Sequence, residues 1–183
     1  MEWKKLKEEA KEFALKKIDV IDYDNHERKI MEYIRDLAPK YGGNSNLLEV
    51  ATYLHDLGWF EDENNHAKAS ANIAATFLKE QGPDQDTISE IEYVIESHEA
   101  TGGLENINAR ILRAADGLAI INNIPYLFFL SWNKDKLNMS YEEGLGNFAG
   151  PMITSALEKV DGLDSKLVDP ILREYIQKYI RGE

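Results

Sequence analysis

The sequence contains no cysteine and no long apolar run. The absence of cysteine among its 183 residues excludes disulfide bonds and thiolate metal sites. A membrane-spanning helix needs about 20 predominantly apolar residues, and the apolar stretch at residues 127–130 is far shorter. Residues 1–5 lack the apolar core of a signal peptide. We therefore expect a cytoplasmic protein that makes no membrane contact.

Positive charge is also scarce. The chain has 21 lysines and arginines against 33 aspartates and glutamates, and its formal net charge is −12. A field of this sign repels polyanions, so we expect no nucleic-acid partner. A small anionic substrate is still compatible with this charge, because bound divalent cations would make a pocket locally positive.

The alternation of apolar and polar residues that marks half-buried strands is missing throughout the chain. Apolar residues instead recur at the three- and four-residue spacings of amphipathic helices. The predicted fold class is therefore all-α, and the length is that of one domain over residues 1–183. About nine helices are expected, at residues 2–18, 26–40, 47–54, 66–81, 85–98, 105–122, 126–132, 153–160 and 166–180.

Several helix ends carry capping or breaking residues. Asp24 or Asn25 is a plausible N-cap for the helix at 26–40, and Pro39 with the glycines at 42–43 is expected to end it. Residues 44–46 are expected to cap the next helix, and Asp84 the helix that begins at residue 85.

The four histidines lie where the helical pattern turns a side chain towards the core. His26, His66 and His98 stand at helix ends, in register with the apolar positions of the same helix. Asp116 shares such a stripe within residues 110–120, and a carboxylate is costly to bury unpaired. A single inward histidine is usually a core residue, but this set needs a shared partner. A pair of metal ions is the simplest one.

His55 and Asp56 are adjacent, and Gly58 follows them. Neighbouring residues in mid-helix point about 100° apart, so they seldom serve one site. At a helix C-terminus loosened by a glycine, both side chains can turn towards a common point. An imidazole nitrogen and a carboxylate oxygen together suit a first-row divalent metal.

His26, then His55–Asp56, then Asp116, in this order, resemble the H…HD…D signature of the HD-domain superfamily of metal-dependent phosphohydrolases. His66 and His98 fall where many members of that superfamily place two further ligands for a second metal. The resemblance covers about residues 20–122. It implies an HD-domain helical bundle with this metal-binding core, on which the helices of residues 123–183 pack.

The resemblance implies one or two divalent ions per chain. Their ligands would be His26, His55, Asp56, His66, His98 and Asp116, with Asp56 as the bridge between two ions. A donor set of nitrogen and oxygen atoms suits Mn, Fe, Co, Ni or Zn better than Mg. The two histidines His66 and His98 leave an alternative open, because in a one-metal enzyme they would instead bind the substrate phosphate as imidazolium groups.

The expected reaction is hydrolysis of a phosphate ester in a small phosphorylated molecule, with a nucleotide as the leading candidate. Two metals would share an activated water and clamp a phosphoryl oxygen. Two alternatives stay open. A minority of HD proteins resemble inositol oxygenase, in which the same set of histidines and aspartates holds two irons. The second alternative is a ligand-sensing or scaffold protein with a vestigial metal site.

Four residues are candidates for a catalytic role. Asp56 is the bridging ligand, and Lys68 and Arg113 are candidates to hold a phosphate through charge-assisted hydrogen bonds. Glu61 belongs to an acidic loop that is either a solvated turn or a source of a carboxylate near the metal-bound water. An acid pair follows the HD dyad in the alarmone hydrolases of the superfamily, but Glu61 lies further from the dyad than in that branch.

The aromatic residues at 126–132 have two interpretations. They form part of the core or of a homodimer contact, or they form a wall of the substrate pocket beside a base or ring. The sequence leaves a homodimer open.

Overall fold

The computed structural model describes residues 2–18, 23–59, 61–62, 65–99, 103–123 and 149–181. Within these ranges the chain forms eight α-helices and no strand, which confirms the all-α fold class. The helices are α1 (Trp3–Leu15), α3 (Arg28–Tyr41), α4 (Ser45–Leu54), α5 (His66–Gln81), α6 (Gln85–Glu96), α7 (Ile107–Ile121), α10 (Gly150–Asp161) and α11 (Pro170–Ile176). The expected helix at 126–132, with its aromatic residues, lies outside the described residues.

Short segments of other helical types join these helices. A π-helical turn, η1 (Tyr23–Glu27), leads into α3, and a 3₁₀ turn, η2 (Ser97–Glu99), follows α6. A second 3₁₀ turn, η4 (Ser165–Leu167), precedes α11, and a π-helical turn, η5 (Gln177–Arg181), follows it. No helix within the described ranges has the length and apolar character needed to cross a membrane.

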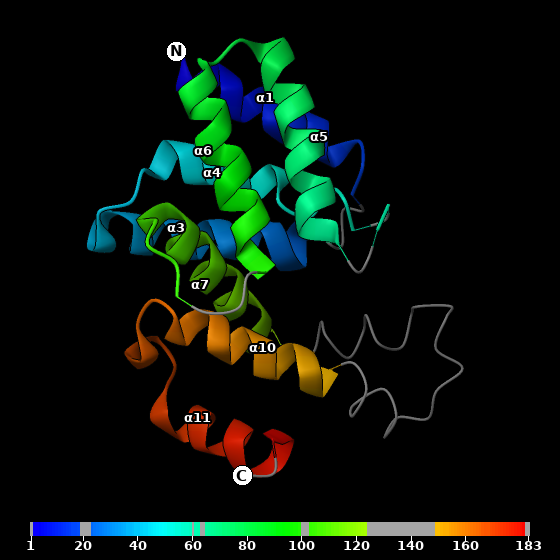
Figure 1. Cartoon of the computed structure of the whole chain (residues 1–183). Helices are drawn as coiled ribbons and strands as arrows, with labels where there is room; N and C mark the ends of the chain where they lie inside the picture. Colours follow the sequence, from blue (N-terminus) through cyan, green and yellow to red (C-terminus); the bar gives the residue numbers. More distant parts are fainter. Residues whose placement is uncertain are drawn as a thin grey trace.

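Helix α7 is the central element of the fold. Thirteen of its residues are buried, from Asn108 to Ile121, and α3, α6 and α10 all contact it. Figure 1 shows α1, α4, α5 and α6 towards one end of the molecule and α10 and α11 towards the other, with α3 and α7 between them. Because α7 is enclosed by its neighbours, three of its polar residues, Asn108, Arg113 and Asp116, are buried as well.

Two of the predicted caps are confirmed. The side chain of Asn44 accepts hydrogen bonds from the backbone amides of Asn46 and Leu47, and Asp84 accepts one from Thr87. These bonds satisfy backbone donors that a helix start leaves unpaired.

Other predicted helix ends are only partly right, because the glycines at 42–43 do end α3 but the N-cap at Asp24 or Asn25 and the break at Pro39 are absent. No side-chain cap precedes α3, because η1 runs directly into that helix. Pro39 lies inside α3, and the helix ends at Gly42, which adopts the left-handed conformation with φ 77° and donates to the carbonyl of Ala38. A proline so near the helix end removes only one hydrogen bond, whereas a left-handed glycine reverses the chain. The expected helix at 166–180 is also broken, since α11 begins only at Pro170.

Candidate metal centre

Asp56 lies at the centre of the four histidines. Its Oδ2 atom is 3.2 Å from Nε2 of His55 and 3.4 Å from Nε2 of His26. Its Oδ1 atom is 3.4 Å from Nε2 of His98 and 3.6 Å from Nε2 of His66. Each carboxylate oxygen therefore faces two imidazole nitrogens, and the predicted convergence of the four histidines on Asp56 is present in the structure.

Five elements place these side chains. His26 comes from the π-helical turn η1, a geometry that often occurs at functional sites. His55 is the C-cap of α4, so the dyad follows the last helical turn, as the sequence predicts. His66 begins α5, and His98 lies in η2 after α6. Asp116 comes from the middle of α7.

Gly58 allows the dyad turn to lie directly against the start of α5. A Cβ atom at this position would be 2.5 Å from the backbone nitrogen of Ser70 and 2.6 Å from Cβ of Ala69. The amide of Gly58 also donates to Oγ of Ser70 at 2.9 Å. Because His66 starts the same helix, this close approach sets its position relative to Asp56.

Backbone hydrogen bonds fix the orientation of two imidazole rings. Nδ1 of His55 donates to the carbonyl of Thr52 at 2.8 Å, and Nδ1 of His98 donates to the carbonyl of Ile95 at 2.7 Å. In a neutral ring this bond leaves the lone pair on Nε2, which is the atom that faces Asp56. A histidine that binds a metal through one ring nitrogen usually donates a hydrogen bond from the other ring nitrogen in this way.

Two further carboxylates complete the cluster. Oδ1 of Asp116 lies 3.3 Å from Nε2 of His26. Oε1 of Glu99 lies 3.5 Å from Nε2 of His98 and 3.8 Å from Nε2 of His66. The structure therefore contains one group able to hold a metal at His26, His55 and Asp116, and another at His66, His98 and Glu99.

Glu99 is a candidate ligand that the sequence analysis missed. It follows His98 at a loosened helix end, in the same relation as Asp56 to His55, so the rule used for the dyad could have found it. Lys159 was missed as well. Its Nζ atom donates to Oδ2 of Asp116 at 2.6 Å and also to Oε1 of Glu99. A lysine in an amphipathic helix normally extends to solvent, so the sequence carries no signal for this position.

The charges in the cluster oppose the cost of burial. Burial lowers the pKa of His55, but the charges of Asp56 and Asp116 outweigh it and raise the pKa to about 10. Burial would raise the pKa of Asp116, yet Lys159 and the histidines lower it to about 2. For the same reason the neighbouring histidines hold the pKa of Asp56 well below its usual range. Without a metal, the site thus holds ionised carboxylates beside protonated imidazole.

Two buried atoms of the cluster make no hydrogen bond to any described residue. They are Nε2 of His55 and Oδ1 of Asp56. A buried polar atom without a hydrogen bond costs about 1–3 kcal/mol, so native proteins rarely leave one without a partner. These two atoms are a nitrogen and a carboxylate oxygen of the kind that divalent metals bind. The residues present therefore fit the metal site that the sequence predicts.

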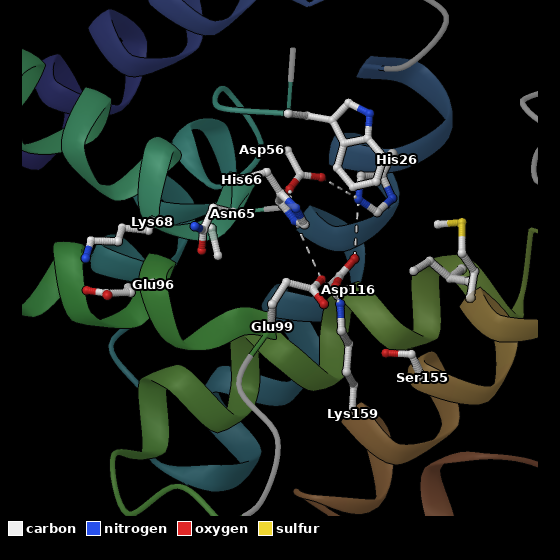
Figure 2. Close-up of a pocket in the computed structure, with 14 residues that line it drawn as sticks. His26, Asp56, Asn65, His66, Lys68, Glu96, Glu99, Asp116, Ser155 and Lys159 are labelled. Carbon is white, nitrogen blue, oxygen red and sulfur yellow. Dashed lines mark hydrogen bonds and ion pairs between the residues drawn. The ribbon is translucent and has the colours of Figure 1, made fainter. Parts of the chain in front are cut away.

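The cluster opens into a cavity of about 730 Å³. The cavity is lined by His26, Asp56, Trp59, Asn65, His66, Ala67, Lys68, Glu96, Glu99, Asp116, Ile120, Met152, Ser155 and Lys159. In Figure 2, Lys68 and Glu96 lie on one side of the cluster and Ser155 on the other. The volume is in the range of ligand pockets, about 300–1,000 Å³.

The three other predicted catalytic residues differ in where they lie relative to the cavity. Lys68 lines the cavity. Glu61 is exposed and is not among the residues that line it. Arg113 is buried, which lowers its pKa, and it does not line the cavity either. The catalytic roles of these three residues stay predictions.

The fold and the site define a class of protein, an all-helical domain with a candidate metal centre rich in histidine and aspartate. The chain matches the family model of the HD domain over residues 23–121, which is more than half of its length. It belongs to the HD-domain family, whose members are typically metal-dependent phosphohydrolases. Searches of curated proteins and of solved structures found no match. Every histidine of the cluster lies within the matched residues, and Lys159 lies outside them.

Proposed function

We propose that the protein is a metal-dependent phosphohydrolase that cleaves a phosphate ester of a small molecule, with a nucleotide as the leading candidate. The observation that carries the proposal is the position of Asp56, with two imidazole nitrogens within 3.6 Å of each carboxylate oxygen. This arrangement allows one carboxylate to be shared between two metal positions, and paired metals suit phosphoryl chemistry.

The chain's own residues would hold the metals in two groups. His26, His55 and Asp116 would bind one ion together with Oδ2 of Asp56. His66 and His98 would bind the other with Oδ1 of Asp56, and Glu99 is a candidate to complete it. When bound, such ions supply Lewis-acid activation of water and stabilise negative charge at a phosphoryl group. Mn, Fe, Co, Ni and Zn all suit these donors.

The charges around the cavity favour a small anion over a polyphosphate. Four carboxylates line it, from Asp56, Glu96, Glu99 and Asp116, against the two lysines Lys68 and Lys159. Two divalent ions would change the balance of these fixed charges from −2 to +2. A phosphomonoester, with a charge near −2 at neutral pH, matches that surplus.

The other lining residues are suited to the organic part of the substrate. The ring of Trp59 lies beside His66, with centroids 4.6 Å apart, and borders the cavity. Tryptophan offers a flat apolar face for a base or a ring. Asn65 and Glu96 add hydrogen-bonding groups. A nucleotide has both a ring and polar edges, so these residues support it as the leading candidate.

A di-iron oxygenase of the inositol-oxygenase type is the second candidate. The observation in its favour is that the four histidines, Asp56 and Asp116 come together in one cluster. This ligand set is the one that the resemblance of some HD proteins to inositol oxygenase implies. A ligand-sensing or scaffold protein with a vestigial metal site is a third candidate, and its expected mark is inactivity against phosphate esters despite full metal loading.

The test combines metal analysis with a screen of phosphorylated metabolites. The purified protein is loaded with Mn²⁺, Fe²⁺ or Zn²⁺, and phosphate release is measured without oxygen, with nucleoside monophosphates and triphosphates in the panel. The proposal expects anaerobic phosphate release from monoesters, lost in Asp56→Ala and retained in Asp36→Ala, an exposed aspartate on α3. Oxygen uptake by the iron form with no phosphate release would favour the oxygenase. Inactivity with full metal loading would favour the sensor.

A further inference from the structure

Lys159 is a buried cation at the metal centre, and only 5% of its surface is exposed. Its Nζ atom donates to Oδ2 of Asp116 at 2.6 Å and to Oε1 of Glu99. Figure 2 shows its side chain reaching from α10 up to both carboxylates. These two carboxylates belong to different metal-binding groups, so the ammonium lies where the two groups meet.

The packing of α10 on α7 brings Lys159 to this position. Gly117 follows Asp116 on α7, and a Cβ atom there would be 2.5 Å from the carbonyl oxygen of Ala156 and 3.1 Å from Cβ of Lys159. The missing side chain therefore lets α10 approach α7 closely beside Asp116. Lys159 thus enters the site from a helix outside the residues matched by the HD domain.

A purely structural role does not account well for this lysine. Burying an ammonium costs several kcal/mol, and replacing a buried ion pair by apolar residues is often neutral or stabilising. An ammonium has three N–H donors. Two of them bond Asp116 and Glu99, and no described residue accepts the third. Lys159 also lines the cavity, where an anion can meet it.

We propose that Lys159 is a substrate-binding residue that holds a phosphoryl oxygen of the anionic substrate through its third N–H donor. The identity of the anion rests on the proposed phosphohydrolase function. Asp116 and Glu99 hold the ammonium beside the metal-binding groups, so the bound phosphoryl group meets both the metals and this cation. A fixed donor of this kind requires no rearrangement when the substrate arrives.

The test is binding of orthophosphate, the product of phosphomonoester hydrolysis, to the full chain loaded with Mn²⁺ and freed of excess metal. Phosphate affinity is measured by calorimetry for wild type, Lys159→Met, Lys159→Arg and Lys159→Gln. The control is Lys79→Met, which changes an exposed lysine of α5 outside the cavity lining. Metal content is measured for every variant, because Lys159 contacts two candidate ligands, and affinities are compared at equal metal content.

Loss of a charge-assisted hydrogen bond should weaken phosphate binding by about tenfold to a hundredfold in Lys159→Met. Lys159→Arg should recover most of this affinity because it keeps the charge, and Lys79→Met should bind as wild type does. If Lys159→Met does not fold, Lys159→Gln should show the loss and Lys159→Arg should not. Wild-type phosphate affinity in a folded Met or Gln variant would show that Lys159 only neutralises Asp116 and Glu99.

Measuring hydrolysis of phosphate esters by the wild type distinguishes failure of this inference from failure of the proposed function. A wild type that hydrolyses phosphomonoesters, with phosphate binding indifferent to Lys159, overturns the inference alone. A wild type that hydrolyses no phosphate ester, with phosphate binding that depends on Lys159, overturns the hydrolase proposal and leaves an anion-binding site in place.

Discussion

Asp56 is the residue that connects the two candidate metal positions. One of its oxygens faces His26 and His55, and the other faces His66 and His98. A shorter or neutral side chain cannot supply both contacts. Its loss would leave the four imidazoles and the buried carboxylate of Asp116 around an empty polar space.

We predict that Asp56→Ala removes most of the bound metal and nearly all activity. Mutation of residues that only support a ligand typically costs about 10–100-fold in affinity or activity, and loss of a shared ligand should cost more. Metal content by mass spectrometry and turnover on the best substrate check this. Asp36→Ala is the matched control on an exposed surface. A full metal load with normal turnover in Asp56→Ala would mean that the site is misassigned.

Protons and metals compete for His55. Its pKa of about 10 in the folded protein lies above the usual value of about 6.5. Protonated His55 therefore stabilises the metal-free fold fully below about pH 6.5, and this contribution is lost as the pH rises through about 10. Asp116, with a pKa lowered to about 2, contributes above its usual pKa and loses its effect only in strong acid.

We predict that metal affinity rises with pH from about 6.5 to about 10, because the imidazole must lose its proton to bind. The increase should be about tenfold per pH unit for each proton released. Calorimetry in buffers of different ionisation enthalpy measures both the affinity and the protons released. Metal should be lost towards about pH 5 and should return at neutral pH. An affinity that stays flat between pH 6.5 and 9 would contradict the raised pKa of His55, and metal that stays bound at about pH 4.5 would argue against imidazole ligands.

At the scale of elements, close approaches at glycines place the helices that carry the site. Gly58 brings the dyad turn against α5, and Gly117 brings α10 against α7. In both places a Cβ atom would be 2.5 Å from a backbone atom of the neighbouring helix. Replacing either glycine would therefore displace that helix, because moving a neighbouring side chain would not relieve the clash. The geometry of the metal centre therefore depends on two glycines that themselves bind neither metal nor substrate.

We predict that Gly58→Ala destabilises the fold and weakens metal binding together. Overpacking typically costs about 1–3 kcal/mol, and here it would shift His66 relative to Asp56. Gly103→Ala is the matched control, because no atom lies within 4 Å of a Cβ at that position. Urea unfolding and metal titration measure the two effects. Wild-type stability and metal affinity in Gly58→Ala would show that α5 can move without disturbing the site.

Much of the helical pattern could be predicted from the sequence, because each cap and apolar stripe is local. Asn44 and Asp84 cap their helices as predicted. The end of α3 was predicted in part, since Gly42 ends the helix as expected but Pro39 lies inside it. Glu99 follows His98 as Asp56 follows His55, so a local rule could have identified it as a candidate ligand. Lys159 could not be placed in the same way, because its role depends on how α7 and α10 pack, and no local pattern reports that packing.

At the scale of the whole molecule, the sequence is strongly acidic, yet the proposed substrate is an anion. The net charge of −12 repels polyanions from the surface. The metals would reverse this sign only at the cavity, so a small anion could bind there although we expect no nucleic-acid partner. The two-metal form of the proposal therefore depends on how many ions the site holds.

Metal stoichiometry of wild type and of the double variant His66→Ala with His98→Ala is the most direct test of the two-metal centre. Wild type should hold about two ions per chain, and the double variant should hold about one, with turnover lost while the position at His26, His55 and Asp116 stays filled. Two results together would contradict the account. The wild type would saturate with one tightly held ion, whether Mn, Fe or Zn is supplied. The double variant would keep that ion while binding substrate more weakly.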